Sequence, residues 1–135
     1  RPLVVRISLM ILRLAVLINL VLGILFWINT IDPDANTGIK LLHIVLGILA
    51  VISLFTIGIA YGLRGGSFGL ALATFVVGFL LTFVGLFQQN WLTAPDQPHW
   101  IIQIIHLVLG LSAIGLGERI GRQYNHMVRA KAKTA

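Results

Sequence analysis

The sequence predicts an all-α membrane protein, an antiparallel up-down-up-down bundle of four transmembrane helices forming one domain over residues 1–135. Hydrophobic residues make up 58% of the chain and charged residues 10%, against roughly 45–50% and about 25% in soluble proteins. The apolar residues form four runs, each longer than the roughly 20 residues that a helix needs to cross hydrocarbon. Because a bilayer offers no water to backbone groups, these runs must be helices, and short connections make consecutive helices antiparallel neighbours.

The four helices are expected approximately at residues 3–29, 38–63, 67–89 and 98–124. Asn36 or Thr37 is expected to cap the second helix, because both side chains can accept a hydrogen bond from a free backbone N–H. Ser67 is expected to cap the third helix after a glycine-containing turn. Pro98 suits the first turn of the fourth helix, where no N–H is needed.

The positive charges predict how the helices are oriented. Lysine and arginine gather at the amino-terminal flank, in the turn after the second helix and in the carboxy-terminal tail, whereas the loops 30–37 and 90–97 contain none. The positive-inside rule therefore predicts a multi-pass protein with both termini in the cytoplasm, in a membrane that we take to be the bacterial inner membrane. Trp27, Trp91 and Trp100 then fall at the outer boundary, where amphipathic rings anchor helices.

Composition excludes several classes of function. The chain has no cysteine, which excludes thiolate metal sites, cysteine-held iron–sulfur clusters and covalent haem attachment. The net charge of +6 does not indicate nucleic-acid binding, because the basic residues lie in short flanks of the helices. No catalytic triad, carboxylate pair or phosphate-binding loop is visible, so a redox carrier is favoured over a hydrolase or a transferase. A transporter or channel is disfavoured, because charged or broken mid-membrane segments are missing.

A repeated motif places a histidine inside two of the helices. Residues 43–47 read His-Ile-Val-Leu-Gly and residues 106–110 read His-Leu-Val-Leu-Gly, with weaker copies that lack histidine at residues 19–23 and 74–78. An ionisable group in a membrane is costly and by default indicates a functional site. Both histidines lie shortly after the outer ends of diagonal helices, whose axes we expect about 12–14 Å apart, a distance that suits two imidazoles on one metal.

Glycines near the histidines predict room for a flat cofactor. Gly47 and Gly110 lie one turn beyond the histidines on the same helix faces. On the first and third helices, Gly23 and the stretch from Gly78 to Gly85 reach a similar depth. Lys40 is the best-placed cation for a carboxylate of the cofactor. The expected cofactor contacts are therefore His43, His106, Gly23, Gly47, Gly78, Gly110 and Lys40, and the expected metal ligands are His43 and His106.

Four interpretations of the histidine pair compete. Each ring could be a packing group bonded to a neighbouring helix. A bare metal ion would need further carboxylate, histidine or cysteine ligands, and no acidic residue lies at this depth. Each histidine could instead bind one chlorophyll-type pigment. Haem b held by His43 and His106 is favoured, because it needs two neutral imidazoles and no cysteine. His99 and His126, at the outer boundary and in the basic tail, are expected to be solvated.

With His43 and His106 in this arrangement, the chain resembles the compact four-helix membrane cytochromes of the b type, including cytochrome b561-like families and the haem-bearing membrane subunits of respiratory complexes. The resemblance is architectural and covers all four helices. It implies one-electron transfer, with quinol or quinone as the exchange partner and another membrane subunit or redox protein as the protein partner. Many such families hold two haems with four histidines. This chain lacks four histidines within its helices, so we expect one haem here, near the outer face. The alternative is an accessory or assembly subunit of a larger respiratory or photosynthetic complex.

Overall fold

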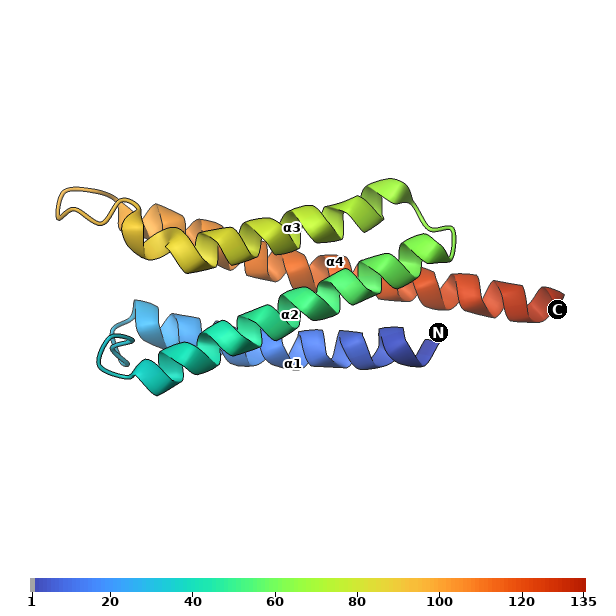
Figure 1. Ribbon diagram of the computed structural model, residues 1–135, viewed down its shortest axis with the longest axis horizontal. Helices are drawn as coiled ribbons and strands as arrows, with labels where there is room; N and C mark the ends of the chain where they lie inside the picture. The colour runs from blue at the N-terminus through green and yellow to red at the C-terminus, as the bar shows by residue number, and fades with distance from the viewer. Residues whose placement is uncertain (1) are drawn as a thin grey trace.

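The computed structural model describes residues 2–135 and confirms the all-α four-helix bundle. Helix α1 spans Pro2–Trp27, α2 spans Thr37–Leu63, α3 spans Phe68–Phe87 and α4 spans His99–Thr134, and a short 3-10 helix, η1, follows α3 at Gln88–Asn90. Consecutive helices run antiparallel. The α1–α2 and α3–α4 loops lie together at one end of the bundle, here called the loop end, and both termini lie toward the other, here called the terminal end (Figure 1).

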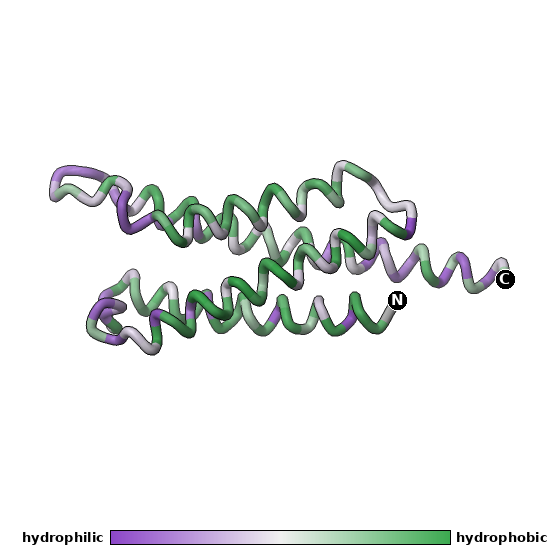
Figure 2. The backbone as a smooth tube through the Cα atoms, in the orientation of Figure 1, coloured by the Kyte–Doolittle hydropathy of each residue, from purple (hydrophilic) through white to green (hydrophobic). Residues whose placement is uncertain are grey.

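All four long helices are long and apolar enough to cross a membrane. Apolar residues extend along the whole bundle, whereas hydrophilic residues gather in the loops and in the tail of α4 (Figure 2). Many large apolar side chains point away from the bundle, and examples from the four helices are Leu17, Ile52, Phe79 and Val108. A helix that is apolar on all sides suits a lipid environment rather than water. The fold therefore fits a multi-pass membrane protein whose outer surface contacts lipid.

The residues that start the helices follow the expected capping chemistry only in part. Ser67 Oγ accepts a hydrogen bond from Leu70 N at 3.4 Å, which confirms the predicted cap of α3. Asn36 precedes α2 but donates its amide to the Asp32 carbonyl at 2.9 Å, so the prediction that its side chain caps the helix is wrong. Pro98 lies immediately before α4 rather than within the first turn.

The helix ends also differ from the expected positions. α1 ends at Trp27 rather than at residue 29, because Asn29 adopts a left-handed conformation with φ 58°. The turn after α2 uses Gly65 at φ +82°, a conformation that glycine adopts without steric cost. α4 continues to Thr134 rather than to residue 124, because the tail is rich in alanine, lysine and arginine, which favour helix outside the membrane as well.

The tightly packed core lies in the half of the bundle toward the terminal end. It is built by Val5, Leu9, Leu12 and Ala15 of α1, by Ala50, Leu54, Ile57 and Tyr61 of α2, and by Ala113, Ile120 and Tyr124 of α4. Small residues allow this close approach, since an added Cβ at Gly117 would overlap Leu12 and one at Gly58 would overlap Thr74. Here α2 and α4 also contact each other across the diagonal of the bundle.

The half toward the loop end is packed less tightly. No residue of the segments 16–27 in α1, 37–49 in α2 or 99–112 in α4 is fully buried. The α1–α2 hairpin and the α3–α4 hairpin diverge toward this end (Figure 1). On α1, α2 and α4 the interior of this half is therefore lined by half-buried side chains, the two histidines of the repeated motif among them, whereas α3 contributes the buried Val84.

Candidate cofactor site between two histidines

His43 of α2 and His106 of α4 face each other across the bundle. Their ring centroids are 6.3 Å apart and their planes are inclined by 62°. Both residues lie at nearly the same distance from the first residues of their helices, which start at the same end of the bundle. The prediction that the two histidines reach a common depth on diagonal helices is confirmed.

Both rings carry a buried nitrogen without a hydrogen-bond partner. Within residues 2–135, Nδ1 of His43 and Nδ1 of His106 have no partner, and neither does Oδ1 of Asn19 in the same layer. Leaving a buried polar group unpaired costs about 1–3 kcal/mol. Histidines that only packed against neighbouring helices would be expected to avoid this cost by bonding to them. Three unpaired polar atoms in one layer instead indicate a site suited to a further polar or metal-bearing group.

Asn19 connects α1 to this layer. Its amide donates a hydrogen bond to the His43 carbonyl at 2.9 Å, and an added Cβ at Gly47 would lie 3.4 Å from the same amide nitrogen. Phe26 packs edge-on against the His43 ring, with centroids 5.5 Å apart. Asn19 was not among the predicted site residues, although it occupies the histidine position in the copy of the motif at residues 19–23.

Each histidine has a glycine from the preceding helix beside its ring. An added Cβ at Gly23 would lie 3.7 Å from His43 Cε1, and one at Gly85 would lie 2.9 Å from His106 Cε1. Gly23 was predicted individually, whereas Gly85 was only the far end of a predicted stretch. The nearly equal spacing from Gly23 to His43 and from Gly85 to His106 is the sequence signal that identifies it.

The other predicted glycines have different neighbours. An added Cβ at Gly110 would meet nothing within 4 Å, so the surface one turn beyond His106 is uncovered. An added Cβ at Gly78 would overlap the Phe55 ring and approach Val51. Gly78 therefore belongs to the contact between α2 and α3 rather than to the immediate surroundings of a histidine.

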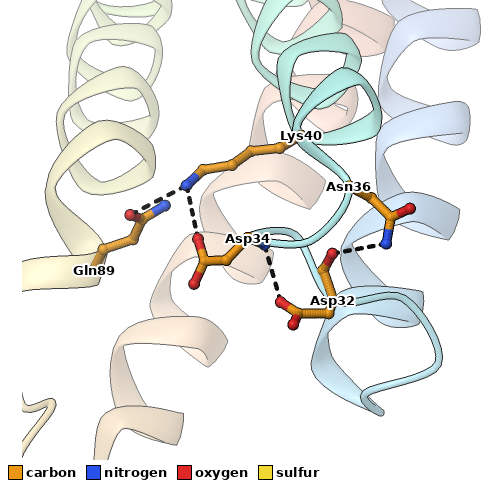
Figure 3. Close-up of polar contacts among 5 residues, drawn as sticks. All are labelled: Asp32, Asp34, Asn36, Lys40 and Gln89. Carbon is orange, nitrogen blue, oxygen red and sulfur yellow. Dashed lines mark hydrogen bonds and ion pairs between the residues drawn. The ribbon is translucent and has the colours of Figure 1, made fainter.

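Lys40 bridges the loop end of the bundle (Figure 3). Its ammonium lies 3.2 Å from Asp34 Oδ1 and 3.5 Å from Gln89 Oε1, and thereby links the start of α2 to the α1–α2 loop and to η1. The Asp34 backbone N–H is held in turn by Asp32 Oδ1 at 2.9 Å. Because the Asp34 side chain is 84% exposed, this ion pair contributes little stability, and the ammonium can rearrange toward another anion.

The two remaining histidines differ from each other. His126 is exposed, which agrees with the prediction. His99 is half-buried, and its Nδ1 lies 2.9 Å from the Trp91 carbonyl, so the prediction that it is solvated is wrong. This contact holds the α3–α4 loop against the first residue of α4, and sequence spacing alone could not reveal how that loop folds back.

The few metal-binding side chains at this site suit a metal that a cofactor already holds by most of its ligands. No group of three or more histidine, cysteine, aspartate or glutamate side chains able to hold a bare metal ion occurs within residues 2–135. Zinc held by protein alone takes three or four such ligands. Haem iron already has four nitrogen ligands from its macrocycle and needs only one or two axial ligands from the protein. Two histidines are too few ligands for a bare ion held by protein alone, whereas two is the number of axial ligands that a haem iron can take.

No protein-family model, curated protein or solved structure matches the chain. The resemblance to membrane b-type cytochromes therefore stays a prediction, and the function has to be inferred from the geometry of the histidine site.

Proposed function

We propose that this chain is an integral membrane b-type cytochrome that carries electrons through one haem b bound between His43 and His106. The separation of the two rings is the observation on which the proposal rests. An imidazole nitrogen binds a metal at about 2 Å and the ring centre lies about 1.2 Å further on, so two rings on one metal have centres about 6.4 Å apart. The observed separation of the centroids is 6.3 Å.

The unpaired atoms around the rings support the same assignment. A histidine that binds a metal through one ring nitrogen usually donates a hydrogen bond from the other, which orients the ring. The Asn19 carboxamide, already bonded to the His43 carbonyl, brings an unpaired oxygen acceptor into this layer. Asn19 therefore offers an unpaired acceptor beside the backbone of His43, although its oxygen is not bonded to the ring in this structure.

The packing of the loop end supports a flat cofactor. On α1, α2 and α4 no residue at this level is fully buried, Gly23 and Gly85 leave room for the ring edges of the two histidines, and the surface at Gly110 is uncovered. Lys40 is the basic residue at this end of the bundle, where a propionate of the haem would need a cation. The uncovered surface at Gly110 and the cation Lys40 are the features that favour a planar group with acidic substituents over a compact metal ion.

The bound haem would supply reversible one-electron transfer, and the protein would bind it, orient it and exclude water. By the positive-inside rule, the loop end would face outward and both termini would lie in the cytoplasm of a bacterial cell. The haem would then lie near the outer face of the inner membrane. Its electron partners would be a quinol or quinone of the membrane and another membrane subunit or redox protein.

A difference spectrum tests the proposal directly. The protein purified from haem-replete cells should show the sharp reduced α and β bands of a six-coordinate haem and should bind carbon monoxide poorly. His43→Ala and His106→Ala should each give haem-free or five-coordinate protein. The double variant should be no worse than the more severe single variant, because two ligands of one site do not act additively.

His99→Ala and His126→Ala are the matched controls, because they remove the same ring outside the site and should leave the spectrum unchanged. Wild-type protein without a haem spectrum would contradict the proposal. So would a spectrum that depends on His99 or His126 instead. In either case the role of an accessory or assembly subunit, with packing or pigment-binding histidines, would replace it.

A further inference from the structure

A groove at the terminal end of the bundle lies far from the histidine site. It has a volume of about 290 Å³ and is formed where α1, α2 and α4 meet. Its apolar wall includes Val4, Ile59 and Leu63. These side chains are 42%, 50% and 85% exposed, so in a membrane they would be covered by lipid chains. The groove is thus open to the bilayer along one side.

Two polar groups stand beside this apolar wall. The Arg64 guanidinium lies over the Tyr124 ring, with Cζ 5.8 Å from the centroid, and both residues line the groove. Tyr124 is completely buried, and within residues 2–135 its hydroxyl has no hydrogen-bond partner. The neighbouring Tyr61 hydroxyl, in contrast, donates to Gln123 Oε1 at 2.6 Å. The groove is therefore lined by one cation, Arg64, and by a tyrosine whose buried hydroxyl is an unpaired donor, beside an apolar surface.

The surrounding charges favour an anion at this position. Apart from Lys40, all lysines and arginines of residues 2–135 lie in the half of the bundle toward the terminal end. The only acidic residue of this half is Glu118, and its carboxylate is already paired with Arg13. The three aspartates lie in the loops at the opposite end. Within residues 2–135, no aspartate or glutamate side chain is therefore available to neutralise Arg64.

We infer that this groove binds an anionic phospholipid. The phosphate would lie against Arg64 and accept a hydrogen bond from the Tyr124 hydroxyl, and an acyl chain would lie along Val4, Ile59 and Leu63. Basic pockets between membrane helices bind anionic headgroups in this way, with about 1 kcal/mol from each lysine or arginine near the surface. The phospholipid supplies both the anion and the apolar chain for which the groove has contacts. The inference does not depend on haem binding.

Native mass spectrometry of the full-length protein tests this inference. The protein in detergent would be titrated with phosphatidylglycerol or with phosphatidylcholine of the same acyl chains. One phosphatidylglycerol should bind in clear preference. Arg64→Ala should weaken this binding about fivefold, and Arg64→Lys, which keeps the charge, should weaken it less. Tyr124→Phe, which removes only the unpaired hydroxyl, should also weaken binding several-fold.

Arg129→Ala is the matched control, because it removes one positive charge from the exposed tail and should leave the affinity unchanged. Equal loss in Arg129→Ala and Arg64→Ala would show diffuse attraction to the basic end and would overturn the inference. Equal binding of the two lipids would also overturn it. Displacement of the lipid by excess inorganic phosphate would assign the groove to a free anion, whereas continued binding would support the phospholipid.

Discussion

Gly85 offers a sharp test of the cofactor site, because Gly23 provides a matched control in the other hairpin. An added Cβ would lie 2.9 Å from His106 Cε1 at position 85 and 3.7 Å from His43 Cε1 at position 23. Carbon atoms in favourable contact are about 3.5–4.0 Å apart. Gly23→Ala therefore creates an ordinary contact, whereas Gly85→Ala cannot be accommodated unless the His106 ring moves.

The size of the effect follows from that displacement. To restore a normal contact, the His106 ring must move by about 0.6–1.1 Å, which exceeds the roughly 0.5 Å within which a functional group has to be held. Perturbing the support of a metal ligand typically costs 10–100-fold in affinity. We expect Gly85→Ala to weaken haem binding by about 10–100-fold and Gly23→Ala by less than about twofold. Alanine favours helix over glycine by about 1 kcal/mol, so neither change should impair the helices.

Haem titration of the apoprotein measures this difference. Each variant is purified, its helix content is compared with wild type by circular dichroism, and haem is added while the absorbance of the bound form is followed. Equal haem affinities in the two variants, or a loss only in Gly23→Ala, would refute the reasoning. Loss of helix in Gly85→Ala would show instead that this glycine serves the packing of α3 and α4.

Three further predictions concern packing, space and topology. Gly58→Ala should lower the free energy of unfolding by about 1–3 kcal/mol in a denaturant titration, because the new Cβ overlaps a side chain of α3. In Gly62→Ala the new Cβ would lie 3.6 Å from its nearest neighbour, so the free energy of unfolding should not change. An equal loss of stability in both variants would contradict this packing argument. Gly110→Leu should reduce haem content while the helices remain inserted, and full loading would show that the uncovered surface faces lipid. In intact cells, Asn36→Cys should react with an impermeant thiol reagent and Thr134→Cys should not, whereas the opposite pattern would invert the topology.

The fold could be predicted from the sequence because a bilayer leaves the backbone few choices. Long apolar runs must satisfy their own hydrogen bonds, so their number, length and antiparallel order follow from hydropathy and loop length. The tail of α4 was missed because the expected end at residue 124 was taken from the end of the apolar run, and the helix continues beyond that run to Thr134. Alanine, lysine and arginine of the tail have high helix propensity in water, so the helix does not need an apolar environment to continue.

The sequence by itself determined that His43 and His106 meet at one depth, because an ionisable residue recurs in the same motif on two helices that start at the same end. Depth follows from a rise of about 1.5 Å per residue. Only the tertiary structure decided which side chains surround the rings, including Gly85, Asn19 and the different environment of Gly78. The rotation of each helix about its axis sets these contacts, and it results from the packing of all four helices together.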